Sequence, residues 1–451
     1  MINDDTIVAI ATASGVGAIS IVRLSGKNSL NIALQITKKQ ELKPRLATLS
    51  KVYDKTSDLI DEALIIYFKN PNSFTGEDIV EFQCHGGIAI TNLILDTTIS
   101  YGARLANPGE FSQRAYLNEK IDLSQAYAIS KLIEAKSANA VKLLAKQLKG
   151  ELSSFVNEIR EDLLFILAYV EVSIDYAEED LPADIFEQIK TKISNITLKL
   201  NNTLESSKRR EGMIDGFKVA IIGKPNVGKS SLLNKLLNFD RAIVSSIAGT
   251  TRDTIEENIN IGTHIIKIVD TAGIREASDE IEKIGIEKSK EAINEADIVL
   301  ALFDNSRPFD SEDEQIKELI DGTSKHIITI LNKCDLQTKF NRSKLSNIDI
   351  ELSIEKSLEK SSLKPIVDAL EQILNTNNSS DDMTLVSKNQ IIAVEDTLND
   401  INQSKVLLQT GELEFFAHHI NEALQNISKI TRPYENDQML DVMFGEFCLG
   451  K

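Results

Sequence analysis

The stretch "FKVAIIGKPNVGKSSLLNKLL", residues 217–237, decides the fold of the central part of the chain. Its first six residues are the apolar run of a buried strand, its end has helical spacing, and the pattern G-x-x-x-x-G-K-[ST] joins the two. In this context glycines let backbone N–H groups converge on phosphates, and the helix N-terminus adds its positive end. The pattern therefore predicts a nucleotide loop that contains Asn226, Val227, Gly228, Lys229, Ser230 and Ser231.

Three further apolar runs follow this loop, each preceded by a helical segment. They are "HIIKIVD", "DIVLALF" and "HIITILN", at residues 264–270, 297–303 and 326–332. Buried strands that alternate with helices are typical of a parallel sheet with crossover helices. We therefore expect a Ras-like P-loop domain over residues 216–376.

Two short motifs after the loop are typical of phosphate and metal contacts. "GTTRD" places two threonines where a loop could close over the γ-phosphate, and "DTAG" places Asp270 at a strand end, where it can hold the shell of a Mg²⁺ ion. We expect Ser230 and Thr251 to ligate Mg²⁺ and Lys229 to reach the outer phosphates. The remaining residues expected around the nucleotide are Ser245, Ser246, Ile247, Ala248, Gly249, Thr250, Thr251, Asp270, Thr271, Ala272 and Gly273.

The motif "NKCD", residues 332–335, tests which base the site accepts. The carboxylate of Asp335 can accept from both the ring N–H and the exocyclic amine of guanine, a donor pair that adenine lacks. Asn332 and Lys333 complete the motif, and Ser353 is expected in the last guanine loop, where Ile354 replaces the usual alanine. The nucleotide predicted from these residues is GTP.

The residue that orients the attacking water is open to three interpretations. Many GTPases use a glutamine after the "DxxG" turn, but Ile274 stands there and can neither donate nor accept. Glu282 could hold the water, Arg252 or Arg275 could act as an arginine finger, or a K⁺ ion could take the place of that finger. The ligands expected for K⁺ are Asn226, Ser245, Ile247 and Thr250.

The segments on either side of this central domain have different patterns of apolar residues. Residues 1–118 mix β-rich runs with turns and one helical stretch near residues 29–39, which predicts a compact α/β domain. Apolar residues recur at helical spacing over 123–174, 185–204 and 389–428. We therefore expect a helical domain in two parts, 119–215 and 377–451, around the inserted nucleotide-binding domain.

Composition limits the compartment and the partners. A net charge of -18 argues against a broad basic platform for nucleic acid. The three cysteines, Cys84, Cys334 and Cys448, are widely spaced and favour a reducing compartment. Because no apolar run approaches the ~20 residues of a membrane span and the first residues fit no leader peptide, we expect a cytoplasmic protein without a membrane contact.

Motifs along the whole sequence resemble those of one family, the tRNA modification GTPases called MnmE or TrmE. Beside the nucleotide motifs, the resemblance rests on "DTIVAIATASGVGAISIVRLSG", "PNSFTGEDIVEFQCHGG", "PGEFSQRAYLNEKIDLSQA" and the terminal "FCLGK". It implies an N-terminal domain that forms a homodimer and binds formyl- or methylene-tetrahydrofolate. The matching positions are Arg23, Glu81, Lys120 and Lys451.

The same resemblance implies a reaction and a partner. GTP and K⁺ would bring two nucleotide-binding domains face to face, with Glu282 assisting hydrolysis. A flavin-dependent subunit similar to MnmG or GidA would carry FAD, complete a heterotetramer and make most of the contact with tRNA. Together they would add an aminomethyl or carboxymethylaminomethyl group to the wobble uridine of certain tRNAs.

The role of Cys448 and the function of the protein are each open to an alternative interpretation. The chain ends in lysine after an acidic stretch, which argues against prenylation of Cys448. The thiol is either simply buried or, as the resemblance suggests, a reactive group on a tail that reaches the folate-linked centre. The rival function is a GTP-dependent RNA-binding switch such as a ribosome-assembly GTPase, which the acidic charge and the lack of a basic RNA-binding module disfavour.

Overall fold

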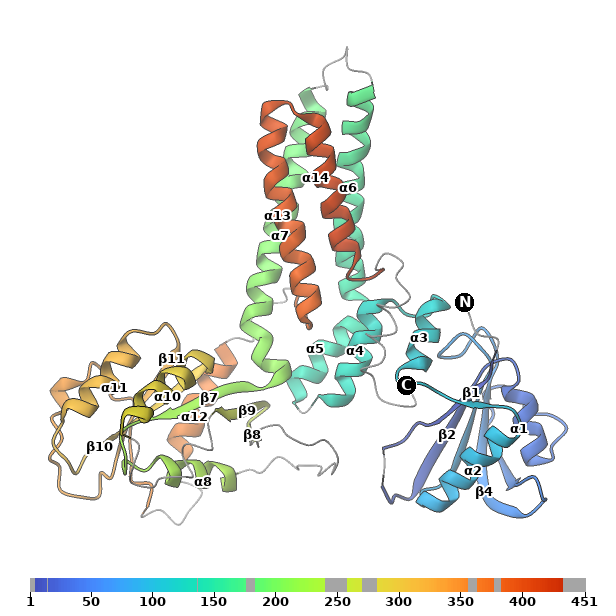
Figure 1. Cartoon of the computed structure of the whole chain (residues 1–451), viewed down its shortest axis with the longest axis horizontal. Helices are drawn as coiled ribbons and strands as arrows, with labels where there is room; N and C mark the ends of the chain where they lie inside the picture. The colour runs from blue at the N-terminus through green and yellow to red at the C-terminus, as the bar shows by residue number, and fades with distance from the viewer. Residues whose placement is uncertain are drawn as a thin grey trace. The chain divides into compact units, whose positions relative to one another are not determined.

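A computed structural model describes residues 5–13, 15–135, 137–175, 183–239, 258–269, 282–355, 363–376 and 383–432. The colours of Figure 1 give the residue numbers along the ribbon. The chain divides into two compact units. The first contains residues 1–134, 144–197 and 392–451, and the second contains residues 135–143 and 198–391. The division falls inside three helices, α5, α7 and α13, with bounds Ala138–Leu148, Ala183–Asp215 and Lys388–Thr410.

The N-terminal sheet has the strand order β3-β4-β5-β2-β1-β6. Its neighbours pair antiparallel, apart from β1 and β6, which run parallel. The predicted β-rich runs form β1, β2, β4 and β5, whereas β3 and β6 were not anticipated. The strand bounds are Ile7–Ile10, Ile19–Ser25, Thr48–Tyr53, Leu59–Phe68, Ile79–His85 and Arg104–Leu105.

Helices α1 (Ser29–Thr37) and α2 (Ile88–Ser100) cover one face of this sheet. The expectation of a single helical stretch in this domain was wrong, since α2 and α3 (Glu110–Leu117) are helices as well. The sequence of α2 is rich in isoleucine and threonine, which favour strands. The hydroxyls of Thr91 and Thr98 donate to carbonyls of the preceding turn, and Ile94 is buried against the sheet, so packing stabilises the helix despite this composition.

The helical periodicity over residues 123–174 is divided between three helices. They are α4 (Leu123–Glu134), α5 and α6 (Glu151–Asp175), and Gly150, with φ +86°, separates the last two. The helix expected over 185–204 is longer than predicted, because α7 spans Ala183–Asp215. The segment expected over 389–428 forms α13 and α14 (Leu413–Ser428).

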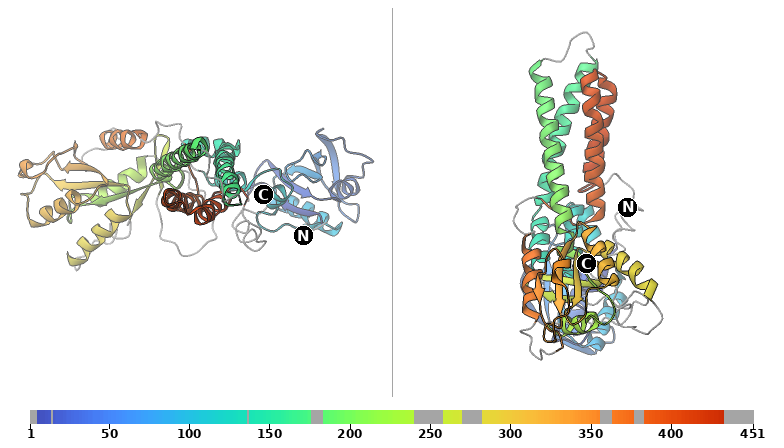
Figure 2. Two further views of the ribbon diagram at one scale, coloured as in Figure 1. Left: turned by 90° about the horizontal axis from the view of Figure 1, so that it is seen from above. Right: turned by 90° about the vertical axis from the view of Figure 1, so that its left-hand side faces the viewer.

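Helices from before and after the central domain pack together in the first unit. Helix α6 lies along α14, and the first half of α7 lies beside α6, as Figures 1 and 2 show. Lys192 of α7 forms an ion pair with Asp162 of α6, and Nδ2 of Asn426 in α14 donates to Asp400 of α13 at 2.8 Å. The helical domain is therefore built from two segments that are far apart in the sequence.

The central sheet has the strand order β12-β11-β10-β7-β9-β8. The pairs run parallel except for β8 with β9, and the four predicted runs form β7, β9, β10 and β11. The connections reverse direction at β7, and such a switch point leaves a crevice outside the carboxyl ends of the strands. The strand bounds are Phe217–Ile222, Asn258–Ile261, His264–Val269, Ile298–Asp304, His326–Asn332 and Ile350–Glu351.

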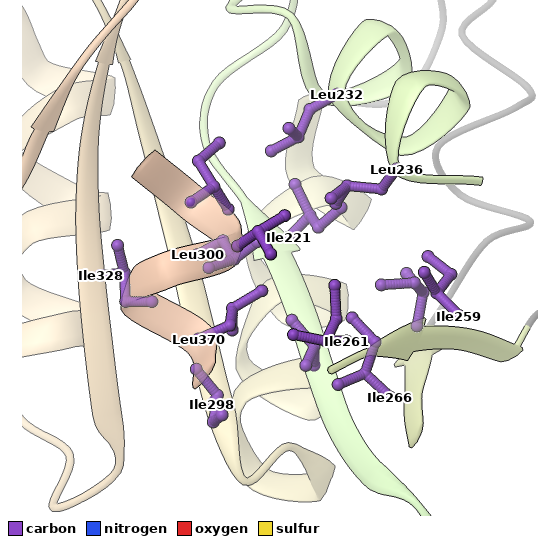
Figure 3. Close-up of a cluster of buried hydrophobic side chains, with 14 of the residues drawn as sticks. Ile221, Leu232, Leu236, Ile259, Ile261, Ile266, Ile298, Leu300, Ile328 and Leu370 are labelled. Atoms are coloured by element: carbon purple, nitrogen blue, oxygen red, sulfur yellow. The ribbon is translucent and has the colours of Figure 1, made fainter. Parts of the chain in front are cut away.

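Alternate residues of these strands bury opposite faces of the sheet. On one face Leu232 and Leu236 of α8 (Lys229–Phe239) and Leu370 of α12 (Lys364–Thr376) meet Ile221 and Leu300, as Figure 3 shows. On the other face α10 (Glu282–Glu295) and α11 (Ser311–Asp321) cover the intervening residues. Two buried faces explain why the strands read as continuous apolar runs.

The predicted fold class, an α/β N-terminal domain with a helical domain and an inserted P-loop α/β domain, is confirmed. Across the described ranges, none of the helices combines the length and apolarity that a bilayer span requires.

Candidate functional site

The nucleotide loop lies between β7 and α8, at the carboxyl edge of the central sheet. It begins at Gly223, whose φ is +148°, and a Cβ at this position would lie 2.5 Å from the carbonyl oxygen of Leu302 on β10. Only glycine lets the loop turn so close to the neighbouring strand. The sheet therefore fixes the entrance of the loop at the switch point.

Lys229 is the first residue of α8 and points back across the loop. Its Nζ donates to the carbonyl oxygens of Gly223 at 2.6 Å and Lys224 at 3.0 Å. Burial lowers the pKa of Lys229, an effect that the charge of Glu312 opposes. Ser230 and Ser231 follow in the first turn of the helix, whose positive dipole end faces the loop. An anion placed here would meet an ammonium and a helix N-terminus together.

Asn332, the first residue of "NKCD", joins this loop to the base-reading segment. Its Nδ2 donates to the carbonyl of Val227 at 2.7 Å, and its Oδ1 accepts from the backbone N–H of Ile354 at 3.0 Å. Gly228 has φ +108°, and a Cβ there would lie 2.4 Å from the same Nδ2. One amide side chain thus bridges three segments that are distant in the sequence.

Lys333 is a second link between the base-reading motif and the nucleotide loop, and it also binds the end of β10. It has φ +61°, and its Nζ donates to the carbonyl of Asn226 at 2.7 Å and to Asp304 at 2.8 Å. Asp304 ends β10, and its side chain is 1% exposed. Burial disfavours the carboxylate, but hydrogen bonds from Lys333 and Ser306 outweigh it and hold the pKa of Asp304 below its ordinary value.

The expected guanine contacts also lie side by side. Oγ of Ser353 donates to Oδ1 of Asp335 at 2.5 Å. The next residue, Ile354, is buried, and its backbone carbonyl accepts from Lys235 of α8. The isoleucine therefore packs below the loop, and the segment still provides a serine hydroxyl at the base-reading end.

Much of the predicted metal and γ-phosphate machinery lies outside the described residues. This holds for Ile274, for both candidate arginines, Arg252 and Arg275, and for the residues expected in the two closing loops. Glu282 is the first residue of α10, so the backbone of this catalytic candidate is described. The predicted residues outside the described ranges are Ser245, Ser246, Ile247, Ala248, Gly249, Thr250, Thr251, Asp270, Thr271, Ala272, Gly273, Cys448 and Lys451.

The N-terminal sheet brings two of the expected folate residues together. Arg23 of β2 and Glu81 of β5 are directly opposite each other in the antiparallel register. Nε and Nη2 of Arg23 lie 2.9 and 2.8 Å from Oε1 of Glu81. The guanidinium also lies 5.9 Å from the ring centroid of Phe111 on α3. The pair projects from the sheet face opposite to α1 and α2, because its neighbours in both strands belong to the core under those helices.

Lys120 lies after α3, where its N–H donates to the carbonyl of Ala115 at 2.8 Å. Its side chain runs beside Gly76, so that a Cβ on this glycine would lie 3.0 Å from Cε of Lys120. Helix α3 therefore supports both Lys120 and, through Phe111, the Arg23–Glu81 pair. The arrangement offers cations and a carboxylate, which are the groups that a pterin with a glutamate tail requires.

Two residues of the central site were missed from the sequence. Asp304 could have been predicted, because it is the last residue of a buried strand and therefore lies at the carboxyl edge of the sheet. It is in register with Asn332 on β11. No local pattern indicates the role of Lys224, because its partners, Asp310 and Asp313, are 86 and 89 residues further along the chain.

Comparison with known proteins agrees with this arrangement. The family model described as "GTP-binding protein TrmE N-terminus" matches residues 6–120, and the "MnmE helical domain" model matches residues 123–448. The tRNA modification GTPase MnmE of Aliarcobacter butzleri is 68% identical, over 100% of both chains. Those of Sulfurimonas denitrificans and Sulfurovum sp. are 59% and 56% identical, over 100% and 99% of both chains. This chain therefore belongs to the MnmE, or TrmE, family of tRNA modification GTPases.

Proposed function

We propose that this GTPase uses GTP cleavage to drive the addition of an aminomethyl or carboxymethylaminomethyl group to the wobble uridine of certain tRNAs. The observation that carries the proposal is the Asn332 bridge, which holds the phosphate loop and the base-reading loop in one body. The names of the full-length relatives supply the class of substrate, a tRNA.

Each described residue of the central site has a role in this proposal. Lys229 and the first turn of α8 receive the outer phosphates, and Asp335 and Ser353 receive the guanine edge. Asn332 and Lys333, also expected at the nucleotide, hold the loops as well, because their side chains bind the loop carbonyls and Asp304. The chain therefore contributes a preorganised set of donors, on which phosphoryl transfer depends.

Two cations would complete the site. Ser230 and Thr251 would hold Mg²⁺, and Asn226, Ser245, Ile247 and Thr250 would hold K⁺. Asn226 suits this role because it is exposed in the loop, with φ +64°, while Lys333 fixes its backbone carbonyl. When bound, the cations supply positive charge at the phosphates.

The one-carbon unit would come from formyl- or methylene-tetrahydrofolate in the N-terminal domain. Glu81 would accept from the pterin, with Arg23 beside it at 2.8 Å to orient the carboxylate, and Lys120 would face the glutamate tail. Lys451 and a reactive Cys448 would complete this centre. The active assembly would be a homodimer joined by a flavin-dependent subunit that carries FAD and provides most of the contact with tRNA.

The experiment that tests the proposal is nucleoside analysis by mass spectrometry of tRNA from cells that lack the gene. We expect loss of the modified wobble uridine, recovery with the wild-type gene, and no recovery with Lys229→Ala. If tRNA from the deletion strain keeps its full set of modified uridines, the proposal is wrong.

A further inference from the structure

Lys224, the second residue of the nucleotide loop, is buried and held by two carboxylates. Its side chain is 4% exposed, and its Nζ lies 2.7 Å from Oδ2 of Asp310 and 2.6 Å from Oδ2 of Asp313. Burial disfavours the ammonium, but the hydrogen bonds to both acids outweigh it and raise the pKa of Lys224. A buried cation with two ionic partners has one defined position.

The two acids also form the N-terminal cap of α11. Oδ1 of Asp310, the N-cap residue, accepts from the N–H groups of Glu312 and Asp313 at 3.1 and 3.2 Å. Oδ2 of Asp313 accepts in return from the N–H of Asp310 at 3.2 Å, which completes a capping box. Lys224 therefore binds to groups that are already fixed by the helix.

Helix α11 is in turn fixed to the central sheet. Its Ile316 and Ile320 are buried in the cluster that includes Phe303 of β10. A chain of contacts thus leads from the sheet through α11 and its cap to the side chain of Lys224. The side-chain partners of Lys224, Asp310 and Asp313, do not belong to the base-reading segments 332–335 and 353–354.

The backbone of Lys224 is linked to the phosphate-binding lysine. Its carbonyl accepts from Nζ of Lys229 at 3.0 Å, next to the carbonyl of Gly223. The following residue is Pro225, whose ring fixes φ and further limits this peptide. The position of the Lys224 side chain therefore determines where the carbonyl that orients Lys229 lies.

We propose that Lys224 is a positioning residue for phosphate binding, which holds the nucleotide loop against α11 so that Lys229 and the loop N–H groups are preset for the outer phosphates. The inference rests on the binding of GTP at this loop and extends it to a residue that need not touch the nucleotide. The affinity of the loop for the phosphates therefore depends on Lys224, whereas the selectivity for guanine does not depend on it.

The test is isothermal titration calorimetry of full-length protein with GTP and with XTP, together with single-turnover cleavage of GTP. For Lys224→Met we expect about a tenfold weaker affinity for GTP, about 1.4 kcal/mol, and slower cleavage. The stoichiometry of binding and the preference for GTP over XTP should be unchanged. Lys224→Arg should recover most of the affinity, because a guanidinium can bridge both carboxylates.

Two further variants separate positioning from folding. Lys224→Met alone leaves the carboxylate of Asp313, which is 2% exposed, without a cation, so the double variant Lys224→Met/Asp313→Leu should recover part of the thermal stability but not the GTP affinity. Lys317→Met is the matched control, because Lys317 pairs with Asp321 on the exposed side of the same helix at 2.7 Å. It should behave as wild type.

Wild-type GTP affinity and cleavage in Lys224→Met, or in the double variant if the single one does not fold, would overturn the inference. An equal loss of affinity for GTP and of the preference for GTP over XTP would overturn it as well, because it would indicate general damage to the site. Failure of wild-type protein to bind GTP would instead contradict the proposed function.

Discussion

Nδ2 of Asn332 lies 2.7 Å from the carbonyl oxygen of Val227, although 105 residues separate the two in the sequence. This hydrogen bond passes directly beside Gly228, which has no side chain to obstruct it. The phosphate loop and the base-reading motif are therefore joined at Asn332, and Lys333 adds a second link through the carbonyl of Asn226.

Gly228→Ala should separate steric damage from backbone strain. Its Cβ would lie 2.4 Å from Nδ2 of Asn332, so that the bridge must break, and φ at this position is +108°. We expect the affinity for GTP to fall at least tenfold, measured by calorimetry. Gly102→Ala is the control, because Gly102 has φ +105° but no atom within 4 Å of an added Cβ. It should lose about 1 kcal/mol of stability and keep GTP binding; equal GTP affinities in both variants would contradict the account.

Asp304→Asn should change how stability depends on pH. The pKa of Asp304 is lowered in the folded protein, so the unfolded chain binds more protons in acid and the carboxylate stabilises the fold above its unfolded pKa. The contribution is complete at pH 7, where we expect Asp304→Asn to cost about 2 kcal/mol. It is lost as pH falls below about 4 through the lowered folded value. Urea titrations of both proteins should converge in acid, and a constant difference from pH 7 to pH 3 would exclude this role.

Glu282→Ala should affect cleavage and spare binding. An acid that only positions water contributes little to the ground state, so we expect Mg²⁺·GTP affinity near wild type and cleavage slower by about 10²-fold, about 2.7 kcal/mol. The measurement is single-turnover cleavage in saturating K⁺, with Arg252→Ala and Arg275→Ala in parallel. A wild-type rate for Glu282→Ala beside an inactive arginine variant would assign the role to that arginine.

Glu81→Gln should weaken folate binding while it preserves the shape of the site. The amide cannot accept from two N–H groups as a carboxylate does, and it weakens the contact with Arg23, now 2.8 Å from Oε1. We expect affinity for a reduced folate to fall about tenfold by calorimetry, in line with a lost charge-assisted hydrogen bond. Glu62→Gln, an exposed acid on the same sheet, should bind as wild type. Equal affinities for both variants would remove Glu81 from the folate site.

The buried strands and the nucleotide loop could be predicted because their signals are local. An apolar run such as 217–222 and the glycines that follow it identify a strand and its turn without knowledge of the rest of the chain. Helix α2 was missed because its β-branched residues favour strands locally, and only its packing on the sheet reverses that preference. Strands β6 and β12, of two residues each, and β8, of four, were missed because they are short.

The contacts inside the site could be predicted only where strand ends determine them. Asn332 and Asp304 end neighbouring parallel strands, so their proximity follows from topology. The contact of Lys224 with Asp313 depends on how α11 packs on the sheet, and no local pattern contains that information. The pairing of Arg23 with Glu81 likewise requires the register of β2 against β5.

The central claim is that GTP bound at this site drives tRNA modification, and Asp335→Asn tests it most directly. Because Asp335, held by Ser353 at 2.5 Å, reads the guanine edge, the variant should prefer xanthine nucleotides. The measurement is modification of tRNA in a reconstituted reaction with the flavin-dependent partner and a reduced folate, supplied with either GTP or XTP. We predict that wild-type protein modifies the wobble uridine with GTP only and that Asp335→Asn does so with XTP only. Modification by the variant at the wild-type rate with GTP, or by either protein without a nucleotide, would contradict the account.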